Sequence, residues 1–265
     1  MTLLAVAVAG RGLVDPEAPV FAADDEALLR GSAAFETLPV YGGRPFRLEP
    51  HVDRLRFSAE KLGLPQVAGV EELALLVAAT APECVLRLYR TERELLATAA
   101  ALPGDLEQLR RRGLAVQTVE VGSPSELLAG VKSTSYAFAF AARRAAASAG
   151  ADDVVFVAGG RVLEAATANV WWRAGDTLFT PATGAGVLPG VTREAVRELA
   201  RELAYDVEEG VFPLTALLAA DEAFETSSIR EVVPLVSIDG APIGEGRGGP
   251  AAGRLQEALR LLSRP

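Results

Sequence analysis

Short blocks of alternating hydrophobic and polar positions run along this chain, and they predict strands and helices in mixed order. In the first part, Leu55, Ala59 and Leu62 fall at helical spacing and Gly63 ends that helix, while Gly42-Gly43 marks a hairpin turn. The predicted strands cover residues 3–8, 33–41, 44–48, 85–89, 95–101 and 114–121. The predicted helices cover 49–62, 70–79 and 106–111.

The same alternation continues after a stretch at 122–131 that opens with Gly, Ser and Pro, which is typical of a connection between domains. Helices are predicted at 134–149, 192–204 and 250–262, and strands at 153–157, 161–164, 168–173 and 177–180. We therefore expect an α/β protein of two domains with a cleft between them. The expected boundaries are a small domain over 1–120, a linker over 121–127 and a larger domain over 128–265.

Composition and charge exclude several classes of function. Half of the 265 residues are hydrophobic and 23% are charged, as in an ordered globular chain. No apolar run approaches the roughly 18 residues that a membrane span needs, and the apolar first residues read as a strand rather than a secretory signal. A net charge of −9 argues against binding to nucleic acid. With one cysteine and one histidine, we expect no disulfide, no metal site and a cytoplasmic location.

Lysine is rare in this chain, and its rarity singles out one residue. The 26 basic residues include only Lys61 and Lys132 as lysines, and the rest are arginines. A lysine can attack a carbonyl to form a Schiff base, whereas arginine stays protonated. Lys132 stands in the small, weakly polar segment GVKSTSY, so it is a candidate nucleophile. Lys61 ends a predicted helix, where a cation simply favours the helix dipole.

Other segments are candidates for binding an anion or a cationic ring. Thr192 follows a Pro-Gly turn at a predicted helix start, where free N–H groups can hold phosphate. Arg54 can hold a phosphate through its planar guanidinium, or form a surface salt bridge. Glu164 ends a predicted strand and would pair with a protonated ring nitrogen if buried. The hydroxyls of ETSSIREVVP (225–234) can contact phosphate or cap a turn.

Taken in order, these segments resemble the class IV, fold-type IV, pyridoxal-phosphate enzymes. This family includes D-amino-acid and branched-chain aminotransferases and aminodeoxychorismate lyases. The resemblance covers nearly the whole chain. It runs through RGSAAFETLPVYGGRPFRLEPHVDRL, GVKSTSY, VLEAATANVWW, GVLPGVTRE, DEAFETSSIREVVP and SIDG.

The resemblance implies roles for the matching positions. Lys132 matches the Schiff-base lysine that also moves the substrate proton, and Glu164 the acid that pairs with the pyridine nitrogen. The resemblance further implies two domains, a homodimer, and pyridoxal 5′-phosphate as cofactor. The remaining cofactor-binding positions that it implies are Arg54, Tyr136, Val191, Thr192 and Ser228.

Departures from the family patterns bear on the substrate. The F-E-G-x-R pattern of branched-chain aminotransferases is absent, since this chain reads F-E-T-L-P from Phe35. Thr37 resembles the threonine with which lyases eliminate pyruvate. The arginine–x–histidine pair of D-amino-acid enzymes is also absent. The candidates for binding a substrate carboxylate are then Arg87, Arg90 and Arg230.

Three hypotheses follow. The favoured one is a transaminase that exchanges an amino group between an amino acid, expected to be a D-amino acid or else an (R)-amine, and an α-keto acid. The second is an aminodeoxychorismate lyase that releases pyruvate and 4-aminobenzoate. The third is a protein that binds the cofactor without turnover, which the presence of both Lys132 and Glu164 disfavours. A branched-chain L-amino-acid aminotransferase ranks below the first two.

Overall fold

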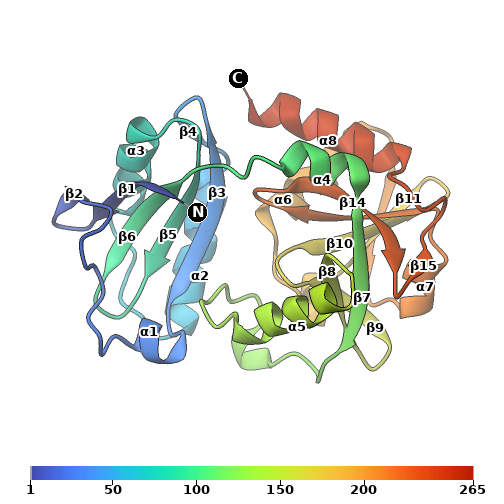
Figure 1. Cartoon of the computed structure of the whole chain (residues 1–265), viewed down its shortest axis with the longest axis horizontal. Coiled ribbons are helices and arrows are strands. Elements are labelled where there is room, and N and C mark those ends of the chain that lie inside the picture. Colours follow the sequence, from blue (N-terminus) through green and yellow to red (C-terminus); the bar gives the residue numbers. More distant parts are fainter. Residues whose placement is uncertain (1, 265) are drawn as a thin grey trace. The chain divides into compact units, whose positions relative to one another are not determined.

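The computed structural model describes residues 2–264, and the chain divides into two compact units (Figure 1). The first unit contains the residues up to Pro103, Val131–Tyr136 and the chain end from Ser263. The second unit contains the remaining described residues. The chain therefore passes between the units more than once. No helix within residues 2–264 has both the length and the apolar character needed to cross a membrane.

The first unit is built on a six-stranded antiparallel sheet with strand order β2-β1-β6-β5-β3-β4. Its strands are β1 (Leu3–Val8), β2 (Gly12–Val14), β3 (Ala34–Tyr41), β4 (Arg44–Pro45), β5 (Cys84–Arg90) and β6 (Leu95–Ala100). Its helices are α1 (Glu26–Arg30), α2 (Leu48–Lys61) and α3 (Val70–Thr80).

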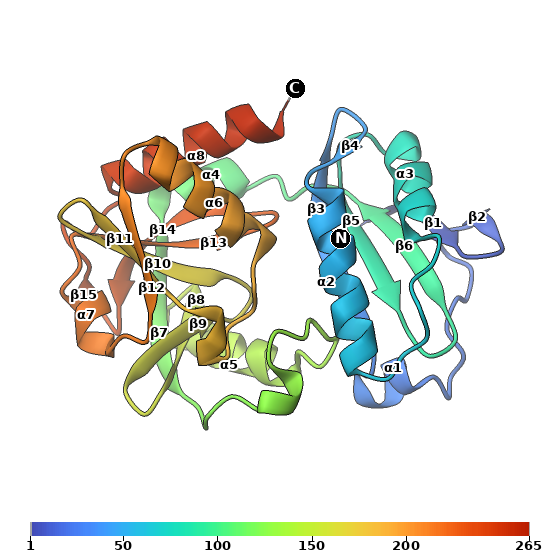
Figure 2. The ribbon, with the colours of Figure 1, turned by 180° about the vertical axis from the view of Figure 1, so that it is seen from behind.

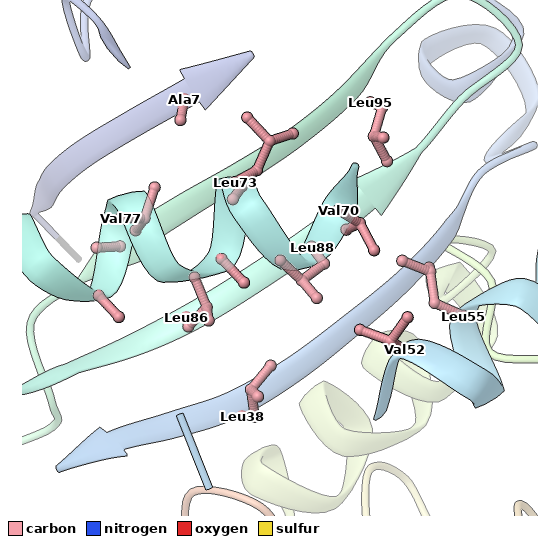
Figure 3. Packing of buried hydrophobic residues seen from close by; sticks show 14 of the residues in the cluster. Ala7, Leu38, Val52, Leu55, Val70, Leu73, Val77, Leu86, Leu88 and Leu95 are labelled. Carbon is pink, nitrogen blue, oxygen red and sulfur yellow. The ribbon is translucent and has the colours of Figure 1, made fainter. Parts of the chain in front are cut away.

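One face of this sheet holds the core of the first unit. Successive side chains of a strand point to opposite faces, so Leu38, Leu86 and Leu88 lie together on the face that α2 and α3 cover. Figure 3 shows them packed against Val52 and Leu55 of α2 and against side chains of α3. Burying each such side chain contributes about 2 kcal/mol. The side chains of the alternate strand residues point to the opposite face of the sheet.

The second unit is built on a nine-stranded mixed sheet with strand order β12-β11-β10-β13-β14-β7-β8-β9, and β15 also pairs with β14. Three pairs are parallel, namely β11 with β12, β14 with β7, and β7 with β8. The strands are β7 (Leu114–Glu120), β8 (Asp153–Ala158), β9 (Arg161–Ala165), β10 (Asn169–Ala174), β11 (Thr177–Pro181), β12 (Asp206–Gly210), β13 (Glu222–Ser227), β14 (Glu231–Ile238) and β15 (Ala241–Pro242).

Helices surround this second sheet. α6 packs on β12 and β13 (Figure 2), and its buried positions recur at the three- and four-residue spacing of an amphipathic helix. The α-helices are α4 (Leu106–Arg112), α5 (Ala137–Ser148), α6 (Val191–Glu202), α7 (Leu214–Leu218) and α8 (Pro250–Ser263). Two 3₁₀ turns are η1 (Glu126–Leu128) and η2 (Thr183–Ala185).

The first unit ends near Pro103, whereas the sequence placed a domain boundary near residue 120. The difference arises because β7 hydrogen-bonds to β14 and β8 and so belongs to the second sheet. The segment 121–127, expected to link the domains, also lies within the second unit.

The helix expected over 134–149 begins at Ala137. Its expected first turn is not helical, because Ser133 forms a β-bridge with Ala34 and Thr134 donates its N–H to the carbonyl of Ala33 at 2.9 Å. Lys132 directly precedes this β-bridge.

Candidate active site

Lys132 lies in the first unit, in a segment whose backbone is held on both sides. The N–H of Phe35 donates to the carbonyl oxygen of Lys132 at 3.0 Å. The N–H of Lys132 donates to Oγ of the buried Ser58 on α2, also at 3.0 Å. These two contacts fix the backbone position from which the lysine side chain extends.

Aromatic rings surround the amine of Lys132. Its Nζ lies 3.2 Å from the hydroxyl of Tyr136 and 4.6 Å from the centre of the Phe35 ring. Phe35 in turn packs edge-on against Tyr136 and stacks on Tyr89, with ring centres 5.4 and 6.1 Å apart. Stacking and cation–π contacts fix this group in place. The arrangement holds the Lys132 amine within hydrogen-bond distance of the Tyr136 hydroxyl.

Arg54 lies on α2, where a buried carboxylate determines its orientation. Glu36 accepts from Nε of Arg54 at 2.7 Å and from its second guanidinium nitrogen at 2.8 Å. Nδ1 of His51, the chain's single histidine, lies 2.7 Å from the same carboxylate. Glu36 and His51 are at most 1% exposed, and Arg54 is 8% exposed.

The protonation states within this triad follow from its burial and charges. Burial by itself raises the pKa of Glu36, but the charge and hydrogen bonds of Arg54 and the hydrogen bond from His51 lower it to about 2. Burial lowers the pKa of His51, against the opposing effect of Glu36. An ionised Glu36 can only accept, so Nδ1 of His51 carries the proton and donates it.

The register of β3 and β5 shows that Arg87 and Arg90, the two candidates of the first unit for binding a substrate carboxylate, point to opposite faces of the sheet. Thr37 pairs with Arg87, and Phe35 pairs with Tyr89, on the face away from the core. Arg90 is three residues from Arg87 and therefore points to the other face. Its Nε donates to the carbonyl of Pro65 at 3.0 Å. Arg87 thus shares a face with Phe35, the ring that contacts Lys132, and Arg90 does not.

Glu164 lies in the second unit, on β9, and its carboxylate is held by neighbouring donors. One oxygen accepts from the N–H of Leu188 at 3.0 Å and from Nδ2 of Asn169 at 3.2 Å. Nδ2 of Asn169 also donates to the carbonyl of Leu188 at 2.9 Å. The half-buried acid is therefore oriented and can pair with a protonated ring nitrogen.

Val191 and Thr192 are buried at the start of α6. The N-cap residue is Gly190, which has no side chain to cap the helix start. A Cβ on Gly190 would lie 2.0 Å from Oδ1 of Asn169. A glycine is thus required where the helix start approaches the residue that orients Glu164, and the first N–H groups of α6 can bind an anion.

The turn between β13 and β14 carries both Ser228 and Arg230. The Arg230 guanidinium lies 2.8 Å from both Asp153 and Glu225. Burial by itself lowers the pKa of Arg230, but these two carboxylates raise it above its usual value. Arg110 donates to the carbonyls of Ile229 and Arg230 at 3.2 and 2.9 Å. Arg230 is thus engaged within its own unit, and its contacts anchor the turn of Ser228.

The residues of each unit fit a part of pyridoxal 5′-phosphate. In the first unit, Lys132 offers an amine for the cofactor's carbonyl, and Arg54 offers a guanidinium for its phosphate. In the second unit, Glu164 offers an oriented carboxylate for the ring nitrogen, and the start of α6 and the turn of Ser228 offer donors for the phosphate.

Comparison with known proteins identifies the family. A family profile described as amino-transferase class IV matches residues 33–238. A Mycobacterium tuberculosis protein named bifunctional aminodeoxychorismate lyase / D-amino acid transaminase is 32% identical, over 86% of this chain and 89% of that protein. The aminodeoxychorismate lyase of Bacillus subtilis is 28% identical, over 96% and 92%. The chain therefore belongs to the class IV aminotransferases.

Solved structures agree with this assignment. A fold IV transaminase from Curtobacterium pusillum is 31% identical, with a TM-score of 0.88, and the match covers 98% of this chain and 99% of that one. The PLP-bound form of a hypothetical aminotransferase from M. tuberculosis is 29% identical, with a TM-score of 0.87 and 98% of each chain covered. The fold expected from the sequence is thus confirmed, and so is pyridoxal 5′-phosphate as the cofactor of the family.

Sequence analysis missed several residues of this site. Ser58 and Asn169 are common polar residues with no motif to distinguish them, and Glu36 lies in a strand where an acid is usually exposed. One signal was available for Glu36, since a strand predicted over 33–41 places it on the same face as the apolar Leu38. An acid on a core face requires a cationic partner, which Arg54 provides.

Proposed function

We propose that this chain is a transaminase that moves an amino group from a D-amino acid, or an (R)-amine, to an α-keto acid. The observation that carries the proposal is the setting of Lys132, whose amine lies 3.2 Å from a tyrosine hydroxyl and against the Phe35 ring. When bound, pyridoxal phosphate supplies the electron sink that makes amino transfer possible. Lys132 attaches the cofactor and, once displaced, moves a proton to and from the substrate Cα.

The other site residues bind or orient. Glu164 keeps the ring nitrogen protonated, because Asn169 and the N–H of Leu188 already orient its carboxylate. Tyr136 places its hydroxyl beside the amine of Lys132, where it would contact the cofactor's phenolic oxygen. Arg54, Ser228 and the first N–H groups of α6 at Val191 and Thr192 would hold the phosphate.

Arg87 is the favoured residue for holding the substrate carboxylate, since it shares a face with Thr37 and Phe35. Arg90 points to the opposite face and donates to Pro65. Arg230 lies between two carboxylates. The name of the M. tuberculosis relative, which includes D-amino acid transaminase, supports a D-amino acid as donor.

Aminodeoxychorismate lyase activity is the second candidate function. Thr37 supports it, because its side chain stands opposite Arg87 on the same strand pair and offers a hydroxyl to an eliminating substrate. Two relatives that match most of this chain carry that lyase name. Branched-chain activity has less support, because this chain reads F-E-T-L-P from Phe35 where branched-chain aminotransferases have F-E-G-x-R.

We further propose a homodimer in the cytoplasm as the working form, on the strength of family membership.

The test is to load the protein with pyridoxal phosphate and add D-alanine, D-glutamate, L-leucine, (R)-1-phenylethylamine or aminodeoxychorismate separately. The proposal expects a change in the cofactor's visible absorbance and release of the matching keto product with a D-amino acid or the (R)-amine. Release of pyruvate and 4-aminobenzoate alone would favour the lyase. Turnover of L-leucine alone would favour branched-chain chemistry, and binding without any product would leave a cofactor-binding protein.

A further inference from the structure

Glu36, His51 and Arg54 form a buried triad in which both Arg54 and His51 donate hydrogen bonds to the Glu36 carboxylate. Neither Glu36 nor His51 has a role in the amino transfer proposed above. Glu36 accepts from two nitrogens on one edge of the Arg54 guanidinium, at 2.7 and 2.8 Å. A bidentate contact of this kind fixes the plane of the guanidinium as well as its position. The donation from His51 at 2.7 Å then fixes the carboxylate.

The triad is also close to the catalytic lysine. Arg54 and Ser58 are four residues apart and lie on one side of α2. Ser58 accepts from the N–H of Lys132 at 3.0 Å. Burial lowers the pKa of His51, and the positive charges of Arg54 and Lys132 lower it further. One helix therefore carries both the arginine and the hydroxyl that anchors the lysine backbone.

We propose that Glu36 and His51 are positioning residues that hold the Arg54 guanidinium in the orientation for binding the phosphate of the cofactor. This proposal rests on the proposed function, since it takes Arg54 as the phosphate-binding arginine. Glu36 and His51 are at most 1% exposed, so neither would touch the cofactor. Both would act through the plane of the Arg54 side chain.

A buried carboxylate next to Arg54 can act in two opposite ways, and these can be separated. If Glu36 only neutralises charge, then Glu36→Gln exposes the full charge of Arg54 and tightens phosphate binding. If Glu36 orients the guanidinium, the same change weakens phosphate binding. Variants of His51 add a test in which the net charge of the protein does not change, because a neutral histidine is replaced by another neutral residue.

The experiment compares pyridoxal phosphate with pyridoxal, which lacks the phosphate, by absorbance titration of the cofactor-free protein. The measured quantity is the ratio of the two affinities. A general loss of structure lowers both affinities and leaves their ratio unchanged. Asp25→Asn is the matched control, since Asp25 is a buried acid of the same unit that caps α1 at the N–H of Ala27.

We expect Arg54→Gln to lower the ratio about 10- to 100-fold, as the loss of a charged hydrogen bond does. Glu36→Gln and His51→Leu should lower it about 10-fold, and His51→Asn, whose amide can replace the Nδ1 donor, should restore most of it. Asp25→Asn should leave the ratio unchanged.

Failure of this proposal differs from failure of the proposed function. If Arg54→Gln lowers the ratio but Glu36→Gln and His51→Leu leave it unchanged or raise it, the positioning role is wrong and the phosphate role of Arg54 stands. If Arg54→Gln itself has no effect on the ratio, both the phosphate role and the positioning role are wrong.

Discussion

Thr37 and Arg87 stand directly opposite each other on β3 and β5, with both side chains on the face away from the hydrophobic core. Phe35, which contacts the amine of Lys132, lies two residues before Thr37 on the same face. This pair therefore brings a hydroxyl and a cation to the sheet face that carries Phe35. Variants of Arg87 test the transaminase proposal, and variants of Thr37 test the lyase alternative.

Replacing Arg87 with Gln should raise KM for D-alanine about 10- to 100-fold, because a charged hydrogen bond to the substrate carboxylate is lost. The kinetics with (R)-1-phenylethylamine, which has no carboxylate, should change little. Steady-state kinetics with both donors measures the difference. Arg90→Gln is the control, since Arg90 points to the opposite face. A larger effect of Arg90→Gln, or equal losses with both donors, would show that Arg87 does not bind the carboxylate.

Replacing Thr37 with Val removes a hydroxyl and keeps the side-chain shape. If the chain has lyase activity, pyruvate release from aminodeoxychorismate should fall about 100-fold, in the range of general acid–base catalysis. Amino transfer should be retained. Thr98→Val serves as control, because Thr98 pairs with Arg87 from the β6 side. Parallel losses of both activities in Thr37→Val would argue against a separate role in elimination.

Gly190→Ala tests the approach of the α6 start to Asn169. The added Cβ would lie 2.0 Å from Oδ1 of Asn169 and displace the side chain that orients Glu164. We expect a loss of about 1–3 kcal/mol in the free energy of unfolding, together with weaker binding of pyridoxal phosphate. Denaturant unfolding and absorbance titration measure the two effects. Gly253→Ala on α8 is the control, since its Cβ meets nothing within 4 Å.

The stability of the first unit should decline in acid. The pKa of Glu36 is lowered from 4.5 to about 2, so its contribution is fully present above about pH 4.5 and is lost as the pH falls toward 2. That shift corresponds to on the order of 3 kcal/mol. The pKa of His51 is lowered by its burial, so the unfolded chain binds this proton more readily than the folded one. The free energy of unfolding therefore begins to fall as the pH drops below 6.5, the ordinary pKa of histidine.

Denaturant unfolding of the wild type and Glu36→Gln between about pH 3 and 7 checks this. The stability difference between the two proteins should shrink as the pH falls below about 4.5. A difference that stays constant over that range would mean that the ionisation of Glu36 is not linked to folding.

Much of the fold could be predicted from the sequence, because the apolar spacing of single elements is a local property. The helix around Leu55 and the strand before Gly42-Gly43 appear where the pattern placed them. The strand expected over 44–48 is shorter, because it ends at Pro45 and α2 begins at Leu48. The start of α5 could not be predicted, because Ser133 pairs with Ala34, about a hundred residues earlier in the chain. α1 was also missed, because it is short and relies on the Asp25 cap.

The candidate site residues likewise include some that the sequence indicates and some that depend on contacts between distant segments. Lys132 could be singled out because lysine is rare in this chain. Its partner Ser58 is 74 residues away, and no local pattern indicates which polar residue will meet it. The opposite directions of Arg87 and Arg90 could have been predicted, because residues three apart on a strand always point to opposite faces.

The central claim, that Lys132 attaches the cofactor, has a direct measurement. The protein is loaded with pyridoxal phosphate, reduced with borohydride, digested and examined by mass spectrometry to locate the modified lysine. The account predicts modification of Lys132 and none of Lys61, the other lysine of the chain. Lys61→Arg should be modified like the wild type, and Lys132→Arg should not. Modification of Lys61, or none at Lys132 in the wild-type protein, would contradict the account.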